Sequence, residues 1–327
     1  MLKPIEWKDD KLFLIDQRKL PNNLEYFECK SLDDVCFAIK NMVVRGAPAI
    51  GIVAAFGVTF GLKEGQDFEL ISDRLLKTRP TANSIQYVIS MMSETPNIEE
   101  ALVFSLDLLR ADIERNKKIG FNGKSLIKNN HHIITHCNAG SLATAGYGTA
   151  LGVLKAAKDE GIAFFTYVDE TRPLFQGSRL TAYELLYEKI DFTIICDNAA
   201  SFIMKIKKID LVIVGADRIV SNGDVINKIG TYGLAIAARE HGVPFYVAAP
   251  VYAFDFSINN GYEVPIEYRD PAEIKNIAGF DIAPYNASAL NPSFDVTPSR
   301  FISGYITEKG IYSAHDIKKL GGTNDNL

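Results

Sequence analysis

After residue 125 the sequence alternates short apolar runs with longer helical segments, and this alternation constrains the fold more than any other feature. The runs are "HHIITHC" from residue 131, "IAFFTYVDE" from 162, "DFTIICDN" from 191, "DLVIVGAD" from 210 and "VPFYVAAP" from 243. Near-continuous apolar strands joined by helices indicate a parallel sheet that is covered on both faces. Because crossovers in such sheets are right-handed, we expect an open, doubly wound, Rossmann-like layout.

The first 125 residues have a different character. Their longer segments, among them 31–44, 49–65 and 97–120, have helical length and spacing. Ser31 is a plausible N-cap, with Asp34 in the fourth position of a weak capping box. The sequence therefore predicts an α/β protein with two domains: a smaller, mainly helical N-terminal domain over 1–125, and a Rossmann-like domain with a doubly wound parallel sheet over 126–327.

Composition and charge exclude several classes of protein. The net charge is −5, without a basic stripe of the kind that nucleic acid or an anionic membrane would need. No apolar run reaches the roughly 18 residues of a membrane helix, and the N-terminus has no signal-peptide pattern. The four cysteines have no C-x-x-C spacing, so we expect free thiols in a reducing, cytoplasmic setting.

Polar residues close four of the five apolar runs. They are Cys137, Asp169 with Glu170, Asp197 and Asp217. Ligands of open parallel sheets bind beyond the carboxyl ends of the strands, so this edge is the expected place for a site. A single acidic strand end is commonplace because Asp often opens a turn, but the combination points to catalysis. For Cys196 in "IICDN" we expect a buried packing role.

Cys137 lies in "THCNAGSLATAGYG", before a chain of small residues. Small residues let a ligand approach a helix start closely, and a thiol there would have its thiolate favoured. The alternative is a packed cysteine under a tight turn. His136 is adjacent, but neighbours in an extended strand point to opposite faces, so a direct Cys–His pair is not expected. No histidine spacing suggests a metal site.

Asp217 ends an apolar strand, where burial would raise its pKa and suit it to acid or base work; Arg218 would oppose that shift if it pointed the same way. After the turn "SNGD", Asn227 and Lys228 supply an amide and a cation before Gly230. A lysine with backbone N–H groups is a common phosphate-binding set. The alternative is a helix start with ordinary surface polarity.

Three further segments place arginines in turns. Arg45 lies in "VVRGAPAIG", followed by an expected kink at Pro48; Arg79 lies in "KTRPTANS". Arg172, Gln176 and Arg179 follow the second apolar run. Each position could equally be structural, but together with Lys228 they would suit a phosphorylated small molecule.

Several of these motifs, in the same order along residues 40 to 315, resemble the S-methyl-5-thioribose-1-phosphate isomerase family. They are "VRGAPAIG", "RPTA", "THCNAGSLAT", "VDETRPLFQGSRLTAYEL", "VGADRI", "NKIGTY", "NPSFDVTP" and "YITEKGIY". Related families are the ribose-1,5-bisphosphate isomerases and the regulatory subunits of translation initiation exchange factor 2B. The resemblance implies an aldose–ketose isomerase of methionine salvage, without metal or nucleotide cofactor, that acts on a sugar phosphate as a homodimer.

The resemblance also implies residue roles. Cys137 and Asp217 match the catalytic pair. The substrate-binding positions match Arg45, Gly46, Ala47, Arg79, Gln176, Asn227 and Lys228. Asp217 would protonate the ring oxygen, and Cys137 would serve the transfer of hydrogen from C2 to C1, either as a base through an enediol or beside a hydride shift.

Two departures from the family pattern concern the substrate. Val251, Tyr252 and Ala253 stand where Thr and Ser usually follow the proline, and Tyr268 stands where an acidic residue is common. A changed loop could alter what is accepted at C5, so 5-deoxyribose 1-phosphate is an alternative substrate, with ribose 1,5-bisphosphate less favoured. A non-catalytic subunit of the initiation-factor type is the alternative function.

Overall fold

The computed structural model describes residues 2–79, 83–93, 97–277 and 279–320. These residues form two compact units. Within the described residues, the first consists of the chain up to Lys118 together with Ala139–Gly152, and the second consists of Ile119–Asn138 and the chain from Val153 to Leu320. The boundary predicted between residues 125 and 126 stays a prediction. The chain leaves the first unit at Lys118, inside a helix, and returns to it for the segment that follows Asn138.

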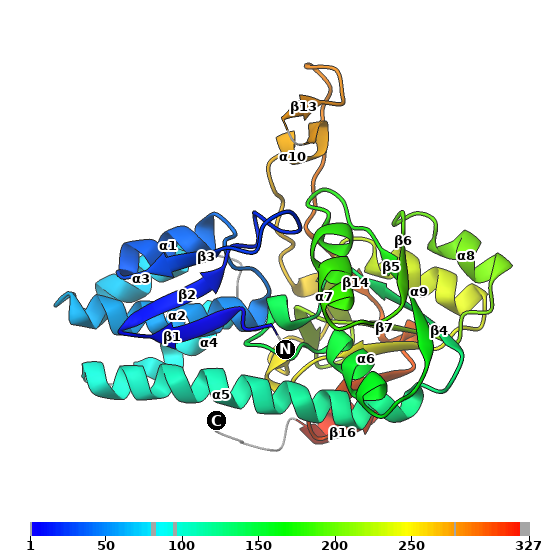
Figure 1. The fold of residues 1–327 in the computed structure, drawn as a ribbon, viewed down its shortest axis with the longest axis horizontal. Helices are drawn as coiled ribbons and strands as arrows, with labels where there is room; N and C mark the ends of the chain where they lie inside the picture. Colours follow the sequence, from blue (N-terminus) through cyan, green and yellow to red (C-terminus); the bar gives the residue numbers. More distant parts are fainter. Residues whose placement is uncertain (1, 80–82, 94–96, 278, 321–327) are drawn as a thin grey trace. The chain divides into compact units, whose positions relative to one another are not determined.

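The first unit packs helices around one central helix, beside a small antiparallel sheet (Figure 1). Its strands are β1 (Ile5–Lys8), β2 (Lys11–Ile15) and β3 (Tyr26–Cys29), and its helices are α1 (Leu32–Lys40), α2 (Ala47–Lys63), α3 (Phe68–Thr78), α4 (Asn83–Met92) and most of α5 (Ile98–Gly123). Residues 49–61 of α2 are all buried, and a helix that is apolar on every side belongs at the centre of a core.

The expected start of α1 is confirmed. Ser31 is its N-cap, and the Ser31 Oγ accepts a hydrogen bond from the Asp34 N–H at 3.1 Å. Pro48 does not kink α2, contrary to the expectation. It lies in the first turn of the helix, where an N–H has no acceptor inside the helix and a proline is tolerated.

The second unit is built on a seven-stranded sheet among the described residues. The strand order is β16-β15-β10-β7-β4-β5-β6, parallel except for β16 at one edge. The strands are β4 (His131–His136), β5 (Phe164–Asp169), β6 (Phe192–Ile195), β7 (Leu211–Val214), β10 (Phe245–Ala248), β15 (Gly304–Thr307) and β16 (Gly310–Tyr312). All five apolar runs are therefore parallel strands of one sheet, as expected.

Helices follow these strands as the alternation predicts. They are α6 (Ala150–Asp159, which starts in the first unit), α7 (Ala182–Tyr187) after a π-helical turn (Gly177–Thr181), α8 (Ala200–Ile206) and α9 (Thr231–Glu240). From β6 to β15 the order is that of a doubly wound dinucleotide-binding fold, with β4 and β7 flanking the point where the winding reverses.

A second, four-stranded sheet is formed by strands that lie in the chain between β7 and β15. It runs β11-β8-β9-β14, with β8 (Arg218–Val220), β9 (Val225–Lys228), β11 (Phe254–Asp255) and β14 (Phe294–Thr297). The chain between β11 and β14 contains α10 (Ala272–Lys275), β12 (Asn276–Ile277) and β13 (Phe280–Asp281). No helix of the described residues has both the length and the apolar content that crossing a bilayer requires.

Candidate active site

The polar strand ends meet at one edge of the seven-stranded sheet. β4 pairs with β5 on one side and with β7 on the other, all parallel. Cys137 follows β4 directly, Asp169 is the last residue of β5, and Asp217 lies just beyond β7. Cys137 and Asp217 therefore come from neighbouring strands at the reversal point, where open sheets of this kind place their ligands.

Cys137 has a left-handed backbone conformation, with φ of 60°. A residue other than glycine in this region costs of the order of 1–3 kcal/mol and persists only where its surroundings fix it. The Thr181 hydroxyl donates to the Cys137 carbonyl at 2.5 Å, and the Asn138 amide donates to Thr181 Oγ1 at 3.1 Å and to Glu184 Oε1 at 2.9 Å. Thr181 ends the π-helical turn, a feature frequent at functional sites.

The helix expected directly after Cys137 begins later, at Ala150. The small residues between them form a loop of the first unit, which contains a 3₁₀ turn over Ser141–Ala143 and a bridge between Gly140 and Gly148. Cys137 is thus the end of a strand rather than the start of a helix, and the helix field does not explain its chemistry.

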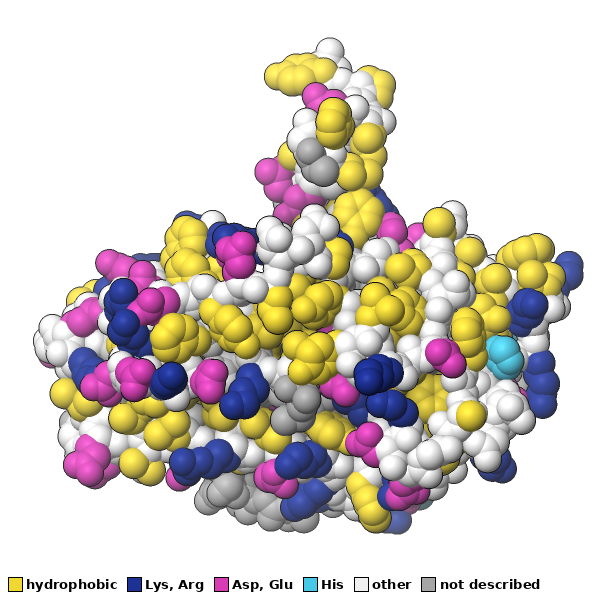
Figure 2. All heavy atoms as spheres, in the orientation of Figure 1, with side chains coloured by type: hydrophobic (Ala, Val, Ile, Leu, Met, Phe, Trp, Pro, Cys, Tyr) yellow, Lys and Arg dark blue, Asp and Glu magenta, His cyan; other side chains and the backbone are white. Residues whose placement is uncertain are grey.

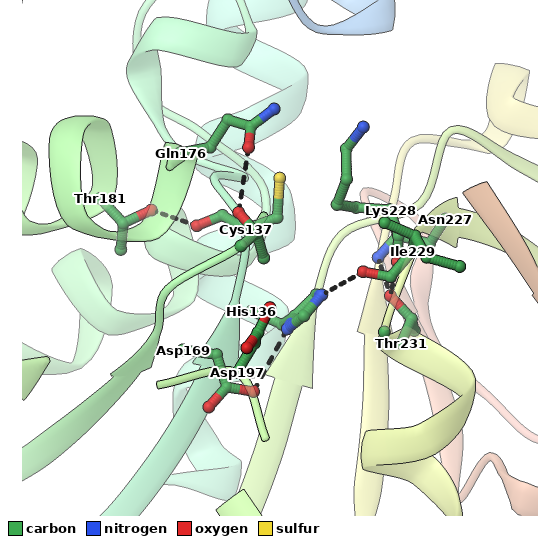
Figure 3. A network of polar contacts seen from close by, with 12 residues as sticks. His136, Cys137, Asp169, Gln176, Thr181, Asp197, Asn227, Lys228, Ile229 and Thr231 are labelled. Carbon is green, nitrogen blue, oxygen red and sulfur yellow. Dashed lines mark hydrogen bonds and ion pairs between the residues drawn. The ribbon is translucent and has the colours of Figure 1, made fainter. Parts of the chain in front are cut away.

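Gln176 and Lys228 extend toward the same side as the Cys137 thiol (Figure 3). Gln176 is buried, and its Oε1 accepts a hydrogen bond from the Thr171 hydroxyl at 3.0 Å, which fixes the amide so that its NH₂ points outward. The Lys228 ammonium donates to the Ser293 carbonyl at 3.0 Å and lies over the Phe294 ring at 4.7 Å from its centre. A thiol, an amide and a cation therefore share one side of this site.

Asp217 and Asn227 lie at the open end of the hairpin formed by β8 and β9. The Asp217 N–H donates to the Ile226 carbonyl at 3.0 Å, and the Asn227 amide donates to Thr231 Oγ1 at 3.0 Å. Arg218 binds Asp255, with Nη1 and Oδ2 3.2 Å apart, so its charge has a carboxylate partner of its own. The turn predicted at "SNGD" is confirmed as the connection of this hairpin.

The remaining predicted binding residues belong to the first unit. Arg45 donates from Nε to Gln17 Oε1 at 3.2 Å, and the Gln17 amide donates to the Leu142 carbonyl at 2.7 Å. Gly46 is the N-cap of α2 and Ala47 is its first residue. Arg79 caps the end of α3, and the rest of the "RPTA" motif lies outside the described residues.

The sequence did not predict the buried pair that His136 forms with Asp169. His136 and Asp169 are partners in the register of β4 and β5, and His136 Nδ1 lies 3.2 Å from Asp169 Oδ2. Figure 3 shows the His136 ring and the Cys137 thiol pointing in different directions, as the strand argument predicts. One feature of the sequence could have indicated this pair: His136 and Asp169 lie at the ends of two consecutive apolar runs of the predicted sheet.

Cys196 is exposed, so its expected buried role is wrong. The reason is the place of β6 at the edge of the sheet, where Thr193 and Ile194 are exposed as well. Among the described residues no group of three His, Cys, Asp or Glu side chains could hold a metal ion.

Comparison with known proteins identifies the family. The Initiation factor 2 subunit family matches residues 43–314. A protein of Caldicellulosiruptor saccharolyticus named methylthioribose-1-phosphate isomerase is 48% identical, over 95% of this chain and 96% of its own. A protein of Thermotoga maritima with the same name is also 48% identical, over 97% of this chain and 98% of its own.

Solved structures agree on the fold. The 5-methylthioribose 1-phosphate isomerase of Pyrococcus horikoshii superposes with a TM-score of 0.88 at 36% identity, covering 99% of this chain and 97% of that one. A structure from A. fulgidus, described as the delta subunit of translation initiation factor eIF-2B, has a TM-score of 0.85 at 39% identity, covering 98% and 100%. The chain therefore belongs to the Initiation factor 2 subunit family and, within it, to the enzymes named methylthioribose-1-phosphate isomerase.

Proposed function

We propose that this protein converts S-methyl-5-thioribose 1-phosphate into S-methyl-5-thioribulose 1-phosphate, an aldose–ketose isomerisation of methionine salvage. The names of relatives at 48% identity over nearly the whole chain support the substrate. The observation that carries the proposal is the placement of Cys137 and Asp217. They follow the two strands that flank the reversal point of the sheet, and Cys137 is held there in a left-handed conformation.

Asp217 is the general acid of the proposed reaction. The phosphate on C1 prevents the ordinary opening of an aldose ring, so the ring must be opened by protonating its oxygen as the bond to C1 breaks. Asp217 is half-buried and gives up this proton. As the ketone forms, the C2 hydroxyl loses a proton, so the protons balance over the reaction.

Cys137 acts at the transfer of hydrogen from C2 to C1. In one route its thiolate takes the C2 proton, and an enediol is then protonated at C1. In the other route the hydrogen moves directly as a hydride, and the largely buried Cys137 helps to keep water away. The two routes differ in whether the transferred hydrogen exchanges with solvent.

The other predicted residues bind and orient the sugar phosphate. Lys228 supplies a cation for the phosphate, and the Gln176 amide, fixed by Thr171, donates to a hydroxyl or to the phosphate. Asn227, whose amide donates a hydrogen bond to Thr231 Oγ1, also binds and orients the sugar phosphate. For Arg45, Gly46, Ala47 and Arg79, the binding role rests on the family resemblance.

We also propose a cytoplasmic homodimer as the working form. In support, the edge strand β6 leaves Ile194 exposed, and the helix after it exposes Phe202 and Ile206. Figure 2 shows hydrophobic side chains, in yellow, at the surface in the region of β6 and α8. An uncovered apolar sheet edge is the kind of surface that association buries.

The test is product formation followed by phosphorus and carbon NMR. Wild-type protein is mixed with S-methyl-5-thioribose 1-phosphate, 5-deoxyribose 1-phosphate or ribose 1,5-bisphosphate, and Cys137→Ser and Asp217→Asn are run beside it. We expect the ketose 1-phosphate from wild type and none from either variant. Repeating the reaction in D₂O separates the two routes, because only the enediol route places solvent deuterium on C1.

A second function is favoured by the likeness to the A. fulgidus chain described as an initiation-factor subunit. A subunit of that kind would need neither the thiol nor the acid. Absence of ketose from all three sugars, together with a Cys137 thiol that no sugar phosphate protects from alkylation, would overturn the isomerase and favour this alternative.

A further inference from the structure

The His136 ring is buried, 1% exposed, between two hydrogen-bond acceptors. Nδ1 lies 3.2 Å from the Asp169 carboxyl, and Nε2 lies 2.9 Å from the carbonyl oxygen of Ile229. A carbonyl oxygen can only accept a hydrogen bond, so Nε2 carries a proton. The contact to Asp169 then needs a second proton, held either on Nδ1 or on the carboxyl group.

Asp169 is suited to sharing that proton. It is 0% exposed, and its other oxygen, Oδ1, has no hydrogen-bond partner among the described residues. Burial raises the pKa of Asp169 to about 6, although the bond and the charge of His136 oppose the shift. Burial lowers the pKa of His136, but Asp169, the Ile229 carbonyl and Asp295 outweigh it, so the pKa of His136 is raised.

The far side of the ring packs against the start of α9. Gly230 is the N-cap of that helix, with φ of 101°, and a Cβ there would lie 2.9 Å from Cε1 and 3.1 Å from Nε2 of His136. Asp295 on β14 accepts the N–H groups of Gly230 and Tyr232 at 2.7 and 3.1 Å. The charged groups that act on the pair are thus Asp295 from β14 and Asp197, which follows β6, while Lys228 from β9 acts on Asp295.

The hydrogen bond between His136 and Ile229 joins the two parts of the proposed site through residues that are direct chain neighbours of Cys137 and Lys228. His136 directly precedes Cys137, and Ile229 directly follows Lys228. We propose that His136 is a positioning residue for the isomerisation: the hydrogen bond from its Nε2 to Ile229 sets where Lys228 lies relative to Cys137. This inference rests on the proposed function, since it concerns the geometry of that same site.

A pH dependence follows from the shared proton. When the pair loses it at high pH, either Nδ1 faces a carboxylate without a proton between them, or the remaining proton moves to Nδ1 and Nε2 can no longer donate to Ile229. Either change weakens the connection to Lys228. We therefore expect kcat to fall on the alkaline side with an apparent pKa that belongs to the pair.

Two substitutions separate positioning from general structural support. In His136→Gln the side-chain amide reaches the place of Nε2 and can donate to Ile229, whereas in His136→Asn it reaches only the place of Nδ1. We expect Asn to lower kcat about 100-fold with KM changed less than about threefold, the size that a misplacement of about 1 Å can produce, and Gln to restore at least about a tenth of the wild-type kcat.

His132→Gln is the matched control, because it makes the same change on the same strand at a residue outside the site. It should keep the wild-type kcat. Asp169→Asn should keep most of the activity and lose the alkaline fall, since the Asn amide donates to Nδ1 at every pH and leaves the proton on Nε2. Equal losses in Gln and Asn variants that remain folded, or an alkaline fall that survives in Asp169→Asn, would overturn the proposal.

A measurement without substrate keeps this test separate from the proposed function. In long-range ¹H–¹⁵N spectra of protein with labelled histidines, five in all, the signal lost in His136→Gln identifies His136. We expect a protonated Nε2 near neutral pH in wild type, and up to high pH in Asp169→Asn. An unprotonated Nε2 would overturn the positioning role whether or not the protein isomerises any sugar, whereas a protonated Nε2 in a protein inactive on every sugar would count against the proposed function alone.

Discussion

At the residue scale, the strained backbone of Cys137 is the feature that distinguishes this thiol from the other cysteines of the chain. Its φ of 60° is stabilised by the Thr181 hydroxyl, which is fully buried and bonded to the Cys137 carbonyl. Local strain of this kind is retained where it aims a reactive group. Thr181 therefore helps to fix the backbone that carries the thiol.

Replacing Thr181 by Val removes the hydroxyl but keeps the shape of the side chain. The buried Cys137 carbonyl and the Asn138 amide then lose a partner, so we expect a loss of about 1–3 kcal/mol in the free energy of unfolding. We also expect kcat to fall about tenfold or more, because the thiol is no longer held in place. Urea unfolding and product NMR measure the two effects. Thr181→Ser keeps the hydroxyl and should stay near wild type in both; a Val variant with unchanged kcat would contradict the role.

At the element scale, the first turn of α2 meets the loop that follows Cys137. A Cβ placed on Gly46 would lie 2.5 Å from the Ala143 carbonyl oxygen, a distance that real side chains do not adopt. Gly46 also has φ of 95°. The glycine of "VRGAPAIG" is thus required for close approach of two backbones, in addition to any contact it makes with a ligand.

Gly46→Ala should destabilise the first unit by more than about 2 kcal/mol, because backbone strain and a backbone collision add. Gly65→Ala is the matched control: it has φ of 73°, but nothing lies within 4 Å of its Cβ position. Its cost should be that of strain alone, about 1 kcal/mol. Urea midpoints of the two variants compare them directly, and equal midpoints would show that the predicted collision is relieved by a small shift.

Elements differ in how far the sequence determines them. The parallel strands were predictable because burial on both faces leaves near-continuous apolar runs, and their order follows from the winding rules. His136 was missed because its partners, Asp169 and Ile229, are 33 and 93 residues away, and only the register of the sheet brings them together. Cys196 was predicted wrongly because an apolar run does not reveal which strand forms the edge of the sheet. The late start of α6 escaped because small residues are compatible with both a helix and a compact loop.

At the scale of the whole molecule, the seven-stranded sheet ends at β6 without a covering strand in the described chain. Ile194 there is 45% exposed, and Phe202 and Ile206 on α8 are 59% and 52% exposed. Parallel sheets usually have both faces covered, and long apolar edge strands are usually protected from water. The proposed homodimer would bury it.

Light scattering coupled to gel filtration tests this surface. We expect the wild-type protein to have twice the mass of one chain, and Ile194→Lys to shift it to the monomer, because a charge at a buried apolar contact is costly. Val103→Lys on α5, a residue 52% exposed in the first unit, makes the same change elsewhere and should leave the mass unchanged. A dimer that persists in Ile194→Lys would place the contact on another surface.

The interrupted course of the chain through the two units has a consequence for how the protein is made. The first unit includes residues 139–152 as well as the chain up to Lys118, so it cannot be completed until residue 152 has left the ribosome. By then β4 and Cys137 have already emerged, ahead of every strand that pairs with them. During synthesis, the N-terminal segment of this protein therefore cannot complete its fold until residues 139–152 have been made. For the same reason, a truncation after residue 118 would yield an incomplete fold rather than an independent domain.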